Sequence, residues 1–283
     1  MEHARGRLRG AVGGASFPTV VAGTSVLVVL TILLGVATKA AGAGLACQAR
    51  WPLCDGGFLN LFPQSFPSFF EWIHRVVAAT VGVGVLASVW LGWRTDAPAG
   101  ARLAVTLGLA LLPVQILLGR ETVLQFTLPI LTAHFWVAFT IFASFAVATA
   151  LAWRPSLTPG RLRRAAAAAA ALVPVQVLLY PPVVTNYSPP VQTFQYAVTL
   201  AVFGVAVAAA VAARDTLDGT PARAALALPV LHPLVVLSGR QLLSPPSPPL
   251  SVYGLLAAAL VGAFAVVAVG YHRASESLGA SKI

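Results

Sequence analysis

The sequence predicts an all-α membrane protein in which eight transmembrane helices form two tandem four-helix bundles. The 283-residue chain is 58% hydrophobic and 9% charged, with a mean hydropathy of +0.85, a composition typical of integral membrane proteins. Apolar runs, each near the ~20 residues that cross a bilayer core, recur along the chain, and the last four repeat features of the first four. The runs cover residues 19–39, 69–93, 103–122, 129–153, 165–181, 190–213, 224–243 and 250–271.

The basic residues set the expected orientation. The formal charge of +10 does not indicate nucleic-acid binding, because the Lys and Arg residues lie in short gaps between apolar runs. With a cytoplasmic N-terminus, thirteen of the eighteen Lys and Arg fall on the cytoplasmic side, as the positive-inside rule expects. We therefore expect a plasma-membrane protein with both termini cytoplasmic. The first run is long and lacks a clear A-x-A ending, so we expect a retained span rather than a cleaved signal peptide.

The loop after the first run carries the chain's only two cysteines, Cys47 and Cys54. In this orientation the loop faces the oxidising outer compartment, which permits a disulfide. Closing a loop of this length stabilises it by roughly 2.5 kcal/mol in the chain-entropy model. Free thiols and a metal or redox-relay role are the alternatives.

The second run opens with three ionisable side chains, Glu71, His74 and Arg75. Charged groups at membrane depth cost a few kcal/mol each on insertion scales and tend to be retained for a site. Glu71 and His74 are three residues apart and share a helix face, so chemistry is expected there. The alternative for Glu71 is an interfacial carboxylate paired with Arg75 or Lys39.

The fourth run contains a second candidate ligand, His134. His74 and His134 each lie about five residues from the outer end of runs that cross the membrane in the same direction, which places them at matched depth. A haem held between two imidazoles needs this arrangement, and helix bundles commonly build such sites in their cores. Each histidine alone could instead be a buried, hydrogen-bonded core residue. Zinc or another metal is disfavoured because cysteine and carboxylate partners do not converge.

A cytoplasmic linker, residues 154–164, separates an N-terminal half, 1–153, from a C-terminal half, 165–283. Four residues of the first half recur at an offset of 120, which indicates a parallel repeat. They are Pro113, Gly119, Arg120 and Pro129, matched by Pro233, Gly239, Arg240 and Pro249.

The repeat does not preserve the candidate ligands. At the same offset His134 matches Gly254. With one residue inserted, the matches of Glu71, His74 and Arg75 are Gln192, Gln195 and Tyr196. The C-terminal half is therefore expected to lack the haem-ligand histidines.

Three further polar residues have weaker signals. Arg120 and Arg240 end the third and seventh runs at the outer interface. Each is a candidate for binding a haem propionate, since guanidinium suits carboxylates, but a snorkelling arginine is an equally good account. His232 matches Leu112 and is interpreted as a hydrogen-bonding residue of the helix bundle. No P-loop, Rossmann glycine pattern or H-E-x-x-H motif occurs.

Several short motifs of this sequence resemble those of the haem A synthase family. The resemblance rests on motifs in the N-terminal half, and extends to the C-terminal half only through the span count and the weak repeat. It implies that His74 and His134 bind the substrate haem iron, that Glu71 is catalytic and that Cys47 and Cys54 pair. The motifs are Gly42-Ala43-Gly44-Leu45-Ala46-Cys47, Trp51-Pro52-Leu53-Cys54, Glu71-Trp72-Ile73-His74-Arg75, Leu118-Gly119-Arg120 and Thr132-Ala133-His134.

The implied activity is oxidation of the C8 methyl of haem O to the formyl group of haem A, for terminal oxidase biogenesis. Two-repeat members hold a haem b in the second half through histidines that match Gln195 and Gly254, so we expect no second haem here. Expected partners are the lipid bilayer, a haem O synthase, terminal oxidase assembly components, an unidentified electron acceptor and, as a homo-oligomer, further copies of the chain; no nucleic acid is expected.

Three other functions remain open from the sequence. A non-catalytic haem carrier or oxidase-assembly factor would keep the pocket without turnover. A membrane cytochrome b would hold a haem b with reversible redox behaviour and little dependence on Glu71. A transporter would need polar groups near mid-membrane on discontinuous helices, for which only His232 qualifies.

Overall fold

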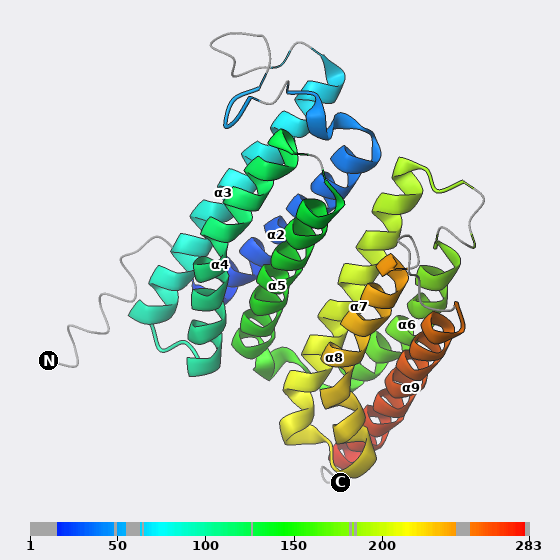
Figure 1. The fold of residues 1–283 in the computed structure, drawn as a ribbon. Helices are drawn as coiled ribbons and strands as arrows, with labels where there is room; N and C mark the ends of the chain where they lie inside the picture. Colours follow the sequence, from blue (N-terminus) through cyan, green and yellow to red (C-terminus); the bar gives the residue numbers. More distant parts are fainter. Residues whose placement is uncertain are drawn as a thin grey trace, which may run out of the picture.

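Helices make up most of the chain that the computed structural model describes (Figure 1), namely residues 16–47, 50–54, 63, 65–125, 127–180, 183, 186–241 and 250–280. No strand occurs in these ranges. Two short 3₁₀ turns, η1 (Ala43–Leu45) and η3 (Arg154–Ser156), lie in connections. The long helices are α2 (Phe17–Ala40), α3 (Phe66–Arg94), α4 (Ala99–Leu124), α5 (Leu128–Ala152), α6 (Pro159–Leu178), α7 (Pro189–Thr216), α8 (Gly219–Gln241) and α9 (Leu250–Ala280).

The long helices pack as two rings of four that stand side by side (Figure 1). In the first ring α2 and α4 each contact both α3 and α5. In the second ring α6 and α8 each contact both α7 and α9. Contacts between the rings join α7 to α2 and to α5. Helix α7 is therefore the element through which the second ring reaches the first.

Local sequence signals explain where several helices begin. The Ser16 side chain caps α2 and accepts a bond from the Thr19 backbone N–H at 3.4 Å. Ser65 caps α3 in the same way, accepting from the Ser68 N–H at 3.4 Å. Proline stands in the first turn of α2, α3, α5, α6 and α7, where its missing N–H leaves no intrahelical bond unmade.

Seven of the described helices are long and apolar enough to cross a membrane. The expected span at residues 165–181 corresponds to α6, which begins earlier, at Pro159, and is not among the seven. Its first turns carry Arg161, Arg163 and Arg164, so the apolar part is about 14 residues, or roughly 21 Å at 1.5 Å per residue. That length falls short of the ~30 Å hydrocarbon core.

The two rings have different cores. The second is rich in small residues, with Ala166 and Ala169 of α6 buried near Ala206 and Ala209 of α7, and small side chains let helix backbones approach closely. In the first ring, α5 buries a row of phenylalanines. One of these phenylalanines, Phe139, connects the two helix rings. Its aromatic ring packs against that of Phe203 in α7, with centroids 4.7 Å apart.

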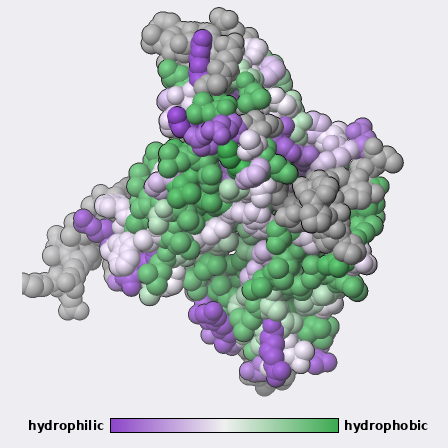
Figure 2. Space-filling model, viewed as in Figure 1, coloured by the Kyte–Doolittle hydropathy of each residue, from purple (hydrophilic) through white to green (hydrophobic). Residues whose placement is uncertain are grey.

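The outer surface matches a membrane setting. Figure 2 shows hydrophobic side chains over the middle of the visible face and hydrophilic ones gathered toward its ends. Large apolar side chains on this surface are exposed in the absence of lipid, including Val83 at 68% and Leu255 at 71%. A bilayer would cover them, so their exposure needs no protein partner.

Candidate functional site

A cavity of about 530 Å³ lies inside the first ring, at the end where α3 and α5 begin. Its volume is within the range of small-molecule and cofactor sites. The walls come from α2, α3, α4 and α5, from the loop after α2, and from two residues of α7. Three predicted site residues of α3 and one of α5 line it, namely Glu71, His74, Arg75 and His134.

Both histidines pack against a glycine of a neighbouring helix. A Cβ atom built on Gly35 of α2 would stand 2.9 Å from Cε1 of His74. A Cβ atom built on Gly119 of α4 would stand 3.2 Å from Cε1 of His134. Carbon atoms in contact are normally 3.5–4.0 Å apart, so a side chain at either position would require the imidazole to shift, more at Gly35 than at Gly119.

The ring nitrogens of the two histidines are incompletely bonded. Nε2 of His134 lies 3.3 Å from the Gln115 amide nitrogen. Nδ1 of His74 and Nδ1 of His134 are buried and have no hydrogen-bond partner among the described residues. Buried polar atoms are normally satisfied by a protein group, water or ion. Each imidazole therefore has one buried nitrogen that no described protein group satisfies.

Glu71 is paired with Arg75, one turn further along α3. Arg75 Nε donates to Glu71 Oε1 at 3.0 Å, and Glu71 is only 6% exposed. The structure places Arg75, one of the two partners expected from the sequence, in contact with this carboxylate. The pair puts a negative charge, with its counter-ion, at the cavity wall.

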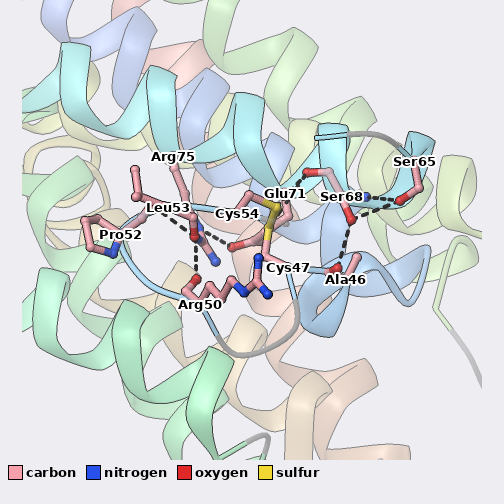
Figure 3. The surroundings of a disulfide bond; sticks show 10 residues. All are labelled: Ala46, Cys47, Arg50, Pro52, Leu53, Cys54, Ser65, Ser68, Glu71 and Arg75. Atoms are coloured by element: carbon pink, nitrogen blue, oxygen red, sulfur yellow. Dashed lines mark hydrogen bonds and ion pairs between the residues drawn. A yellow bond between two sulfur atoms is a disulfide. The ribbon is translucent and has the colours of Figure 1, made fainter. Parts of the chain in front are cut away.

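Arg75 also holds the loop that follows α2 (Figure 3). Its Nη1 donates to the backbone carbonyls of Arg50, Pro52 and Leu53 at 3.0, 3.2 and 2.7 Å. The remaining guanidinium nitrogen, Nη2, has no partner among the described residues. One arginine thus connects the loop to the buried carboxylate of Glu71.

The predicted disulfide between Cys47 and Cys54 is confirmed. Both sulfur atoms lie near the Ser68 carbonyl oxygen, at 3.8 and 3.6 Å. The Ser68 hydroxyl donates to the Ala46 carbonyl at 2.8 Å (Figure 3). The loop is therefore fastened to α3 on both sides of Glu71, at Ser68 and at Arg75.

The two other candidate arginines do not join this cluster. Arg120 is paired with Glu121 at 2.6 Å, its side chain is 45% exposed, and it is not among the described residues that line the cavity. This geometry favours the interfacial account of Arg120. The side chain of Arg240 lies outside the described residues.

Several lining residues were not predicted from the sequence, among them Gly35 of α2 and Gln115 of α4. An isolated glycine inside an apolar run, such as Gly35, indicates close packing. Gln115 had no signal in the sequence. Gln192 and Tyr196 were assigned to the second half by the repeat, yet they line the cavity of the first.

In the second ring, tyrosines occupy the place that the repeat assigns to histidine. Gly239, the match of Gly119, packs against two of them: a Cβ there would stand 3.1 Å from Tyr180 and 3.2 Å from Tyr253. Their ring centroids are 4.9 Å apart. Gln195 is buried, accepts a bond from the Tyr187 hydroxyl and donates to the Gln176 carbonyl at 3.3 Å.

His232 does not fulfil the expectation of a hydrogen-bonding bundle residue. It is fully buried in α8, 5.7 Å from the Phe203 ring by centroid. Neither of its ring nitrogens has a hydrogen-bond partner within the described ranges. It does not line the cavity.

A protein-family model, COX15-CtaA, described as cytochrome oxidase assembly protein, matches residues 18–188. This match covers more than half of the chain, including the cavity walls from α2 to α5. The chain belongs to the COX15-CtaA family. The resemblance to haem A synthases is thereby confirmed, and with the apolar helices it makes the chain a multi-pass protein of a prokaryotic plasma membrane.

Curated relatives carry two kinds of name. A Protoheme IX farnesyltransferase of Halobacterium salinarum is 39% identical over 147 residues, 52% of this chain and 31% of the relative. A Heme A synthase of Bacillus licheniformis is 30% identical over 131 residues, 45% of this chain and 42% of the relative. The matched part thus spans less than half the length of these relatives. No solved structure matches the chain.

Proposed function

We propose that the protein is a haem A synthase-like oxidoreductase that converts haem O to haem A by oxidising the C8 methyl to a formyl group. The observation that carries this proposal is the cavity in which His74 and His134, each seated on a glycine, face a common space beside the Glu71 carboxylate. Relatives named Heme A synthase support the choice of substrate.

The residues present fit a haem. Two histidines from different helices, each with an unpartnered buried nitrogen, provide the ligand pair that haem iron takes. No group of three His, Cys, Asp or Glu side chains occurs in the described part of the chain, so a zinc site is not favoured. Deeper in the cavity the wall is apolar, with Val28, Val81 and Ile141, as an isoprenoid tail requires.

The chain's own groups have separable roles in this reaction. Oxidation of the methyl group of bound haem O to a formyl group would take one oxygen atom from water and release four protons and four electrons, and an external acceptor would take the electrons. His74 and His134 hold and orient the ring. Glu71 stabilises developing positive charge or accepts a proton, which a carboxylate does more effectively away from water. Arg75 positions Glu71 and keeps the outer loop over the cavity, while its Nη2 remains for a haem propionate.

We propose a single haem site. The side chains of Tyr180 and Tyr253 fill the region of the second ring around Gly239, and Gln195 is engaged in its own hydrogen bonds. These contacts support a C-terminal half that packs against the catalytic half and holds no haem b.

We propose the eight-span orientation as well. The apolar length of α6 is short, but α6 packs against both α7 and α9, and neighbouring helices can shield its ends. This keeps both termini cytoplasmic and places the disulfide loop and the cavity at the outer face. A haem O synthase is the proposed partner, since relatives named Protoheme IX farnesyltransferase contain a segment similar to this chain. Oxidase assembly components and self-association remain further proposals of the same kind.

Farnesyl transfer by this chain itself is disfavoured. Prenyl diphosphates are usually bound through Mg²⁺ and carboxylates, and the described residues provide no cluster of acidic or other metal-binding side chains. A haem carrier is the second candidate. It is favoured by one observation, the pairing of Glu71 with Arg75. This ion pair gives Glu71 a structural role, so its presence does not require catalysis.

Substitution separates these functions. We expect His74→Ala and His134→Ala each to abolish the Soret band of the purified protein, whereas His272→Ala, at an exposed position on α9, should leave it unchanged. A full Soret band in either cavity variant would show that the axial pair is wrongly assigned.

For catalysis, we expect Glu71→Gln to retain haem but to lose conversion of haem O, measured by chromatography of extracted haem. Glu276→Gln, an exposed carboxylate, is the control. Undiminished conversion by Glu71→Gln would remove this carboxylate from the mechanism, and no conversion by the wild type would favour the carrier.

A further inference from the structure

The second ring contributes a polar strip to the cavity of the first. Gln192 and Tyr196 of α7 line the cavity, and because they are four residues apart they share one helix face. That face turns toward the first ring, where α7 contacts α2 and α5. Gln195, between them in sequence, is buried and bonds to Gln176 of α6 instead.

Tyr196 is fixed beside the second histidine. Its ring stands edge-on to that of Phe135, with centroids 5.4 Å apart and planes at 80°. Phe135 follows His134 directly, is 8% exposed and also lines the cavity. The Tyr196 ring is therefore packed at the cavity wall against the residue that follows His134.

The strip lies at the outer end of the cavity. Gln192 is in the first turn of α7 and Tyr196 is in the next. Helices α3, α5 and α7 begin at the same end of the molecule (Figure 1), where Lys39 and Arg75 also line the cavity. A haem buries its apolar edge most favourably when its two carboxylates point to such a polar end, since an unpaired buried charge is costly.

We propose that Gln192 and Tyr196 donate hydrogen bonds to a propionate of the haem bound in the first ring, so that the C-terminal half completes the substrate site. The amide N–H₂ and the phenol O–H are both donors suited to a carboxylate. This inference rests on the proposed function. The family match ends at residue 188, so it does not extend to these two positions.

Titration with a matched pair of ligands tests the proposal. Haem b and haem b dimethyl ester, which lacks the carboxylate charges, are titrated into the full-length protein in nanodiscs and followed by the Soret band. The variant is Gln192→Leu combined with Tyr196→Phe, which removes the polar groups at nearly constant volume. Thr193→Val is the control, because Thr193 is on the same turn of α7 and its hydroxyl donates to the Pro189 carbonyl.

We expect the double variant to bind haem b about tenfold to a hundredfold more weakly, as for the loss of hydrogen bonds to a charged group. Its affinity for the dimethyl ester should equal that of the wild type, and its spectrum at saturation should be unchanged. Wild-type affinity of the double variant for haem b would overturn the inference, as would equal weakening for both ligands. If the wild type binds neither ligand, the proposed haem function fails as well.

Discussion

Replacing Gly35 by alanine should displace the imidazole of His74. The added Cβ would lie 2.9 Å from Cε1, 3.4 Å from Nε2 and 3.6 Å from Nδ1 of that ring. Since carbon atoms in contact are normally 3.5–4.0 Å apart, the ring must move by about 0.6–1 Å. The ring packs against Gly35 of α2 and also faces the cavity.

The expected cost follows from this overlap. Inserting a methyl group into a packed interior costs typically ~1–3 kcal/mol. If that cost falls on the haem-bound arrangement, haem affinity decreases by about 5-fold to 150-fold, at ~1.4 kcal/mol per factor of ten. Gly119→Ala should have a smaller effect, because its Cβ would stand 3.2 Å from His134 Cε1.

Gly23→Ala on the same helix is the matched control, since a Cβ there meets nothing within 4 Å. Alanine in a helix is intrinsically favoured over glycine by roughly 0.5–1 kcal/mol, so this variant should be at least as stable as the wild type. Soret titration of the three variants with haem should give the order Gly23→Ala, Gly119→Ala, Gly35→Ala from tightest to weakest. Equal affinities for Gly35→Ala and Gly23→Ala would refute the seating of His74 on Gly35.

Two further predictions concern the outer loop. Arg75→Met should lower the thermal midpoint in detergent, because removing one partner of a buried ion pair costs about 3–5 kcal/mol. Adding Glu71→Gln to this variant should recover part of the lost stability. If the effects of the two substitutions are fully additive, the ion pair is not confirmed. A thiol count under denaturing, non-reducing conditions should be zero, and replacing Cys47 and Cys54 by serine should destabilise the loop by about 2.5 kcal/mol, whereas two free thiols would contradict the disulfide.

The helices and the two histidines were predictable because their signals are local. Hydropathy located the long helices to within several residues. The matched depth predicted for His74 and His134 follows from counting residues along runs of assumed direction, and the structure places both at one cavity. The disulfide was predictable since only two cysteines exist and a short loop holds both.

Features that depend on packing between helices were not predictable in the same way. The start of α6 was placed late, because its arginines were assigned to the linker although they form the first turns of the helix. The role of Arg75 in binding three loop carbonyls depends on a backbone path that no pattern encodes.

The orientation of α7 is the clearest case. A repeat read from sequence places Gln192 and Tyr196 within their own bundle, but the observed packing of α7 on α2 and α5 turns them toward the other. The position of each side chain on its helix could therefore be predicted from the sequence. Which cavity the side chain faces depends on how the helices pack, and only the structure shows it.

We propose one haem site per chain, used for an isoprenoid haem. The most direct test is the pyridine haemochrome spectrum of the purified protein, combined with chromatography of the extracted haem and the haem-to-protein ratio. We expect about one haem per chain, present as haem O, haem A or the hydroxylated intermediate between them. Two haems per chain, or haem b alone, would contradict it.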